Sequence, residues 1–413
     1  MTVKTTLGLL AGMEENDCVR YLGVPYAKPP VGSLRFEAPQ PAEPWEGVRE
    51  AFAPGPRCPQ TGASPGGFYH KEFYDHPLTA QSEDCLYLNV WTSAPGKTDE
   101  KLPVAMWIHG GAYTGGWSWE PEFDGKVWAE KGVVMVTINY RLGLYGFLCH
   151  PLLSEEDENG ISGNYGLYDQ AKAIEWVYDN IASFGGDPNN ITIFGQSAGA
   201  MSVKYQVSSP LVQNLISKAI IMSGTILNVN TKEMTESLGK AVLAELGIDK
   251  AHIDKIKDVP YRELYAAGQR AMGKSIGTRK PGTPMMWGFG PTPDGEILMQ
   301  QPFQPGFSRF ADNKPIIIGT TFNELQRLAY GRQMTTDEAR KALVPTFGEQ
   351  TDDYIKAFDK AWPRHSPNDL LSIDYLFRPK TIITADYVSA HRSTPIYNYM
   401  FTWKSPVNQG SVH

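Results

Sequence analysis

Short runs of nearly continuous apolar residues recur along the chain. Five of them cover residues 104–108, 133–138, 190–194, 218–222 and 315–319. They are rich in valine and isoleucine, and most are bounded by glycine, asparagine or proline. Runs of this length and composition are typical of strands that are covered on both faces. We therefore predict buried strands at these positions.

Between these runs the spacing of apolar residues becomes helical. Residues 167–184 place apolar side chains at intervals of three and four, opposite charged ones. Strands that alternate with helices predict a mostly parallel sheet with helices on both faces. Residues 7–23 and 86–92 instead predict hairpin-like strands at an antiparallel N-terminal edge. We expect one domain over 1–413, with an inserted helical cap at about 231–301.

The composition limits the classes of function. The 413 residues are 41% hydrophobic and 20% charged, so a sizeable core can form and global disorder is excluded. There are 45 acidic and 38 basic side chains, a net charge of −7, and no Lys/Arg block, which argues against nucleic acid as a partner. No apolar run reaches roughly 18 residues, so we expect no membrane span.

The N-terminus and the cysteines bear on location and metal binding. Residues 1–10 lack the apolar core and cleavage site of a signal peptide. We expect a cytoplasmic protein, or a secreted one whose leader has been removed, and the oligomeric state stays open. The 4 cysteines show no CxxC spacing and the 8 histidines no HExxH pattern, so no metal site is predicted.

The clearest chemical motif is G-Q-S-A-G at residues 195–199, directly after a predicted strand and before a helical run. A serine between two such glycines is typical of a tight strand–turn–helix connection that exposes its hydroxyl above a sheet. The N-terminus of the following helix favours negative charge at the same place. A chance Gly/Ser turn is the alternative. We predict that Ser197 is a nucleophile.

A serine nucleophile also needs donors for the oxyanion that forms on the attacked carbonyl. The segment after the 104–108 strand reads H-G-G-A-Y, and its small residues let backbone N–H groups approach a ligand. We predict an oxyanion hole made by the amides of Gly111, Ala112 and Ala198, with His109 shaping the loop. An ordinary glycine-rich turn is the alternative.

Several blocks of sequence together resemble the type-B carboxylesterases, a family that includes cholinesterases and bacterial p-nitrobenzyl esterases. The similar segments are 21–36, 83–90, 139–143, 163–170 and 184–199, in the family's order. The resemblance implies an α/β-hydrolase fold, hydrolysis of carboxylic esters and no cofactor.

The resemblance also implies an acid for the catalytic triad. G-T-T-F-N-E-L at residues 319–325 is similar to the family's G-T-x-x-x-E-G loop, which assigns the acid to Glu324. Leu325 stands where the family usually has glycine, which can alter the loop or narrow the pocket. Asp294, in a Pro-Asp-Gly turn, is the rival acid.

The base implied by the resemblance is His413. Residues 397–403 are similar to the strand that precedes the family's histidine, and His413 follows ten residues later. The order serine, glutamate, histidine is that of α/β-hydrolases. Family members continue for several dozen residues past this histidine, so we expect the C-terminal part of the family fold to be missing.

Three supporting features are carried over from the family as well. Cys58 and Cys85 resemble a family disulfide, although a cytoplasmic chain would keep them reduced. Arg35 and Glu83 resemble a buried ion pair. Ser223 resembles a serine that lies beside the triad.

The expected reaction is acyl transfer from a small ester through a covalent intermediate on the serine. Aromatic and apolar residues near the motifs are candidate pocket walls, although packing is the commoner role for any one of them; they include Tyr113, Trp117, Phe322 and Leu325. A lipase or a feruloyl-type esterase is the alternative within this chemistry. A non-catalytic, cholinesterase-like binding module is the alternative outside it.

Overall fold

The structure is a computed structural model. It describes residues 1–61, 79–156, 162–225, 229–276, 288–299, 307–308, 311–324, 333–371, 374 and 377–403.

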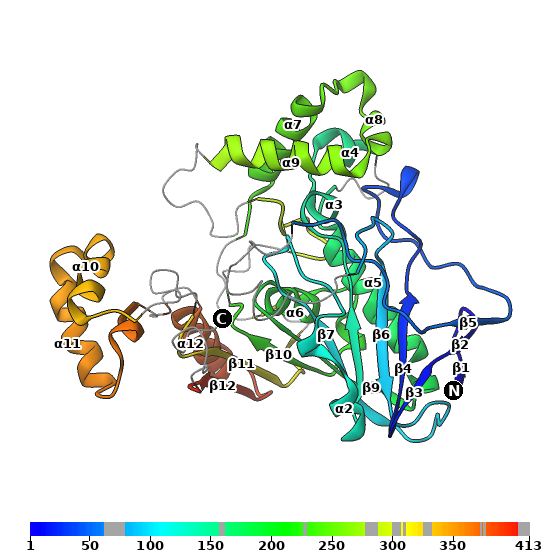
Figure 1. Cartoon of the computed structure of the whole chain (residues 1–413), viewed down its shortest axis with the longest axis horizontal. Coiled ribbons are helices and arrows are strands. Elements are labelled where there is room, and N and C mark those ends of the chain that lie inside the picture. The colour runs from blue at the N-terminus through cyan, green and yellow to red at the C-terminus, as the bar shows by residue number, and fades with distance from the viewer. Residues whose placement is uncertain are drawn as a thin grey trace.

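In this described part, nine strands form a central sheet in the order β12-β11-β10-β9-β7-β8-β6-β4-β3 (Figure 1). Neighbours pair in parallel from β12 to β8, and antiparallel from β8 through β6 and β4 to β3. The bounds are Ile396–Phe401 (β12), Ile316–Thr321 (β11), Lys218–Met222 (β10), Gly186–Gln196 (β9), Leu102–Ile108 (β7), Val134–Ile138 (β8), Tyr87–Thr92 (β6), Cys18–Pro25 (β4) and Met13–Glu15 (β3). The predicted mostly parallel sheet with an antiparallel N-terminal edge is confirmed.

A second, smaller sheet lies at the N-terminal end of the chain. It contains β1 (Thr2–Lys4), β2 (Leu9–Ala11) and β5 (Val48–Glu50). The N–H of Thr6 donates to Oδ1 of Asn180 at 2.7 Å, which ties this sheet to the end of a long helix of the main body.

Helices follow most of the strands. Their bounds are Lys126–Glu130 (α2), Gly143–Phe147 (α3), Pro151–Glu156 (α4), Tyr165–Asn180 (α5), Ala198–Ser208 (α6), Lys232–Leu246 (α7), Lys255–Asp258 (α8), Tyr261–Ile276 (α9), Thr336–Phe347 (α10), Thr351–Ala361 (α11) and Arg378–His391 (α12). No helix in the described ranges has the length and apolar character needed to cross a bilayer.

Alternate residues of the buried strands enter different cores. Val104 and Met106 of β7 belong to the large core that also contains residues of α5 and α6. Ala105 and Trp107 belong to a smaller core that contains Ala129 of α2. Because successive side chains of a strand point to opposite faces, the two cores lie on the two sides of the sheet. Both sides are therefore covered, as the continuous apolar runs predict.

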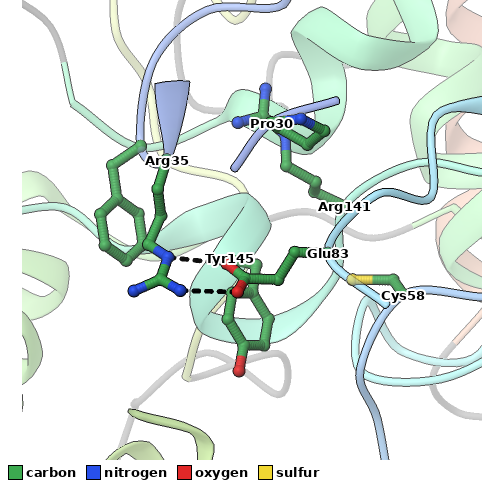
Figure 2. A pocket seen from close by; sticks show the side chains of 7 residues that line it. Pro30, Arg35, Cys58, Glu83, Arg141 and Tyr145 are labelled. Carbon is green, nitrogen blue, oxygen red and sulfur yellow. Dashed lines mark hydrogen bonds and ion pairs between the residues drawn. The ribbon is translucent and has the colours of Figure 1, made fainter. Parts of the chain in front are cut away.

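Residues 232–276, the helical segment, contain α7, α8 and α9 and lie at the top of Figure 1. Arg35 attaches this segment to the body. Its Nη1 donates to the carbonyl oxygens of Ile256 at 2.9 Å and Val259 at 2.7 Å. Its Nε and Nη2 donate to the two carboxylate oxygens of Glu83 at 2.7 and 2.6 Å (Figure 2). The predicted ion pair is confirmed, whereas the cap at 231–301 extends outside the described residues and stays a prediction.

Helices α10 and α11 stand apart from the sheet, at the left of Figure 1. They have a small core of their own, formed by Ala339, Leu343, Phe358 and Leu370.

Candidate active site

Ser197 occupies a tight turn between β9 and α6. Its backbone has φ 56° and ψ −123°, a strained conformation for a residue with a side chain. A Cβ added to Gly199 would lie 2.0 Å from the carbonyl oxygen of Ile108, and one added to Gly195 would lie 2.7 Å from the same atom. Only glycine fits at either position. The strand–turn–helix geometry that the motif predicts is therefore present. Ser197 is partly exposed, so its side chain is not buried in the core.

The loop after β7 lies directly beside this turn. A Cβ added to Gly110 would lie 3.3 Å from Cβ of Ser197. The loop is bent by positive φ angles at Gly111 (97°) and Ala112 (56°). Among the hydrogen bonds of the described residues, the amides of Gly111, Ala112 and Ala198 donate to no protein acceptor. Gly111 and Ala112 are exposed residues of the loop and Ala198 is the buried first residue of α6. Backbone N–H groups at these places beside a serine are suited to receive developing negative charge.

The buried side chain of His109 packs against this loop. It stacks on Tyr140 with ring centroids 4.3 Å apart. Its Nδ1 donates to the carbonyl oxygen of Gly110 at 2.9 Å, and the Tyr140 hydroxyl donates to the carbonyl oxygen of His109 at 2.9 Å. Burial lowers the pKa of His109 to about 4. A neutral, buried imidazole of this kind shapes the loop and is a poor candidate for the base.

Ser223 and Glu324 lie further along the same edge of the sheet. β7, β9, β10 and β11 are parallel neighbours, so the residues that follow them form a row. Ser223 follows β10, and its N–H donates to the carbonyl oxygen of Gly319 at 2.8 Å. Glu324 follows β11 and is 4% exposed, with Oε1 accepting from the N–H of Thr321 at 2.9 Å. Burial and the nearby Glu324 raise the pKa of Tyr399 to about 12.

Asp294, the rival acid, organises a turn instead. Its Oδ1 accepts from the N–H groups of Glu296 and Leu298, each at 3.0 Å. Its Oδ2 accepts from Nδ2 of Asn164 at 2.8 Å and the Tyr168 hydroxyl at 3.2 Å. The two bonds to Oδ1 shape the Pro-Asp-Gly turn and the two bonds to Oδ2 attach it to the first turn of α5, which accounts for Asp294 without a catalytic role.

His413 and Leu325 lie outside the described residues. The strand that precedes His413 is β12, which pairs in parallel with β11 over Ile316–Thr321. The chain therefore leaves β12 at the edge of the sheet where Ser197 and Glu324 lie.

The aromatic residues considered as pocket walls pack within the protein. Tyr113 is 1% exposed and Trp117 is 3% exposed, with the Arg57 guanidinium 5.2 Å from the Trp117 ring. Phe322 packs edge-on against Trp362, with centroids 4.7 Å apart, next to the core of α10 and α11. For Tyr113 and Trp117 the structure shows the packing role that the sequence left open, because their rings are enclosed by protein atoms.

Cys58 and Cys85 are free thiols in the structure, so the disulfide that the resemblance implied is not present in it. The two are nevertheless in contact. A hydrogen bond with Cys58, and then burial, raise the pKa of the Cys85 thiol. Sγ of Cys58 also accepts from the N–H of Leu142 at 3.2 Å.

One residue of the site carries no signal in the sequence. Gln60 forms hydrogen bonds with both backbone groups of Gly116, at the far end of the loop that begins at His109. The two residues are 56 positions apart, and no motif surrounds Gln60. Only the folded structure brings them together.

Known proteins resemble the chain along its whole length. A family model described as "Carboxylesterase family" matches residues 1–413. The chain is 38% identical to the para-nitrobenzyl esterase of Bacillus subtilis (strain 168), over 98% of this chain and 80% of that protein. It is 36% identical to the fumonisin B1 esterase of Sphingopyxis macrogoltabida, over 96% of this chain and 70% of that protein.

Solved structures show the same fold. An esterase from Clostridium hathewayi, described as able to hydrolyse aliphatic aromatic polyesters, superposes with a TM-score of 0.83 at 31% identity. The match covers 100% of this chain and 80% of that one. A p-nitrobenzyl esterase structure superposes with a TM-score of 0.77 at 35% identity, over 99% of this chain and 81% of that one.

Proposed function

The chain belongs to the carboxylesterase family and is a carboxylic ester hydrolase, and from that premise we propose that Ser197, His413 and Glu324 are its catalytic triad. The observation that carries this proposal is the strained turn at Ser197 beside the loop of Gly111 and Ala112, whose amides donate to no acceptor among the described residues. Burial of Glu324 at the same edge supports its role as the acid.

In the proposed reaction, Oγ of Ser197 forms a bond to the ester carbonyl carbon while His413 accepts the hydroxyl proton. The carbonyl electron pair moves onto oxygen, which accepts hydrogen bonds from the amides of Gly111, Ala112 and Ala198. The tetrahedral intermediate collapses and the alcohol leaves with the proton from His413. Water then attacks the acyl carbonyl carbon while His413 accepts a proton from it, and the second tetrahedral intermediate collapses to release the acid as Oγ of Ser197 takes the proton back from His413. Glu324 holds the imidazole in the required tautomer throughout.

Substitution of the nucleophile tests this assignment. Ser197→Ala should lower kcat for p-nitrophenyl acetate by a factor on the order of 10⁴–10⁶, as in other serine hydrolases. The wild type should be labelled by a fluorophosphonate at Ser197, and the variant should not. Ser33→Ala, at an exposed serine, is the matched control. Turnover in Ser197→Ala close to that of the wild type would refute the triad.

For the substrate we propose small or aromatic esters. The support is the naming of two relatives, a para-nitrobenzyl esterase and an esterase described as able to hydrolyse aliphatic aromatic polyesters. A series of p-nitrophenyl esters from acetate to palmitate, together with methyl ferulate, tests this class. Highest kcat/KM on the short or aromatic members is expected. A maximum at palmitate would favour a lipase, and a maximum at methyl ferulate would favour a feruloyl-type esterase.

We also propose that the enzyme works in a reducing compartment such as the cytoplasm. The support is that Cys58 and Cys85 are thiols in contact rather than a disulfide. Secretion after removal of a leader is the alternative, and the state of the cysteines in the purified protein distinguishes the two.

A further inference from the structure

The loop that carries two of the proposed oxyanion donors folds back on its own beginning. Gly111 and Gly116 have φ angles of 97° and 101°. A Cβ added to Gly111 would lie 2.2 Å from the carbonyl oxygen of Gly115, and one added to Gly116 would lie 2.4 Å from Nδ1 of His109. The returning end is therefore in tight contact with the donor end. Any group that fixes Gly116 also fixes the direction of the Gly111 and Ala112 amides.

The side chain of Gln60 is that group. Its Oε1 accepts from the N–H of Gly116 at 2.9 Å, and its Nε2 donates to the carbonyl oxygen of Gly116 at 3.0 Å. Nε2 also donates to the carbonyl oxygen of Cys58 at 3.1 Å. The amide, which is 7% exposed, thus pairs with Gly116 as a neighbouring strand would. A flipped amide would set donor against donor and acceptor against two acceptors, so one orientation is fixed.

Gln60 is itself held in place by other elements. Its N–H donates to Oε1 of Gln81 at 3.1 Å, and the N–H of the next residue, Thr61, donates to the Tyr265 hydroxyl of α9 at 3.0 Å. Because the backbone at Gln60 is fixed by these bonds and its side chain forms two hydrogen bonds with Gly116, Gln60 restricts the movement of the loop.

The geometry points to Gln60 as a positioning residue that preorganises the oxyanion-binding amides through Gly116, an inference that rests on the proposed function. Preorganised donors are aimed at the charge that develops in the transition state, and this charge is absent from the bound ester. Loss of the Gln60 bonds should therefore weaken stabilisation of the transition state much more than binding of the substrate.

The test compares Gln60→Met, which fills the same space without the hydrogen bonds, with Gln60→Ala. Gln40→Ala is the matched control, because the Gln40 side chain is exposed and donates to the carbonyl oxygen of Ala38 at 3.3 Å, while the bond from Lys28 N–H to the Gln40 carbonyl does not involve the side chain. Folding of each variant is verified by circular dichroism. In both Gln60 variants we expect kcat/KM for p-nitrophenyl acetate to fall by roughly 10-fold to 100-fold, short of the larger loss seen when a donor itself is removed. Gln40→Ala should match the wild type.

A pair of ketone inhibitors separates positioning from a merely structural role. Oγ of Ser197 adds to the carbonyl carbon of a trifluoromethyl ketone, and the resulting oxyanion lies where the negative charge of the transition state develops. The corresponding methyl ketone binds without that charge. We expect Gln60→Met to weaken the trifluoromethyl ketone in proportion to kcat/KM, and the methyl ketone by less than about threefold.

Unchanged inhibition by the trifluoromethyl ketone, or equal weakening of both ketones, would overturn the role of Gln60. Those results would leave the proposed triad intact, provided that the wild type is active and Ser197→Ala is not. An active Ser197→Ala would instead remove the triad itself.

Discussion

At the scale of single residues, the turn at Ser197 depends on the absence of a side chain at the neighbouring glycines. Gly199 approaches the carbonyl oxygen of Ile108 so closely that a methyl group would lie 2.0 Å from it. Gly199→Ala must move β7 away from α6, so we expect the free energy of unfolding to fall by about 3 kcal/mol or more, with loss of esterase activity.

Urea denaturation of Gly199→Ala measures this loss. Gly273→Ala is the control, because Gly273 is an exposed position of α9 where the added methyl group would meet no atom within 4 Å beyond its chain neighbours and the nearby backbone of its own helix. The control should be unchanged or more stable by up to about 1 kcal/mol, since alanine favours the helix. Equal stability of the two variants would contradict the tight packing at Gly199.

His109 gives the protein a dependence of stability on pH. Its pKa in the folded state is lowered to about 4 by burial, whereas an unfolded histidine titrates near 6.5. The unfolded state therefore binds more protons between these two values. The contribution of the neutral imidazole is complete above pH 6.5 and is lost as the pH falls to 4, by roughly 3 kcal/mol.

Chemical denaturation of the wild type and of His109→Gln at several pH values between 7 and 4 checks this window. The variant should lose less stability than the wild type on acidification. His391→Gln, at an exposed histidine, is the matched control for the substitution itself. Parallel slopes for His109→Gln and the wild type would show that His109 does not titrate in this range.

At the scale of elements, a buried ion pair joins the segment after β8 to α5. Nε and Nη2 of Arg141 donate to the carboxylate of Asp169 at 2.8 and 2.7 Å, and both residues are 2% exposed or less. Removal of one partner leaves the other charge buried without its counterion. Asp169→Ala should therefore lower the free energy of unfolding by about 3–5 kcal/mol.

An exposed pair of the same kind is the control for this prediction. Arg340 of α10 and Asp352 of α11 also form two hydrogen bonds, at 2.6 and 2.9 Å, but lie in solvent. Asp352→Ala should change the urea midpoint little, because water replaces the lost partner. A small effect at both sites would mean that Asp169 is hydrated.

The elements differ in how far the sequence predicts them. β7, β8, β9, β10 and β11 follow from their apolar runs, because burial on both faces leaves a local pattern. The turn at Ser197 also leaves a local pattern, because both glycines lie within two residues of the serine, although the backbone that excludes a side chain there includes Ile108 of β7. The pairing of Gln60 with Gly116 joins distant segments and leaves no such pattern. The sequence does not distinguish the roles of Tyr113 and Trp117, because aromatic side chains are found both in pocket walls and in hydrophobic cores.

At the scale of the whole molecule, the cysteines report on the integrity of the fold. All four, Cys18, Cys58, Cys85 and Cys149, are buried free thiols. Burial also raises the pKa of Cys18 and Cys149, which keeps these groups in the unreactive thiol form. We expect the native protein to react with less than about one equivalent of a disulfide reagent such as DTNB.

After unfolding without a reductant, the same reagent should detect all 4 thiols of the sequence. This count also tests the proposed reducing compartment. Detection of two thiols fewer would indicate that Cys58 and Cys85 had been oxidised to a disulfide in the protein as isolated.

The attachment of the helical segment by Arg35 has an evolutionary consequence. The guanidinium contacts the carbonyl oxygens at positions 256 and 259, and not their side chains. Main-chain oxygens persist whichever amino acids occupy these positions. Natural variation can therefore alter the side chains of this segment while its link to the body survives.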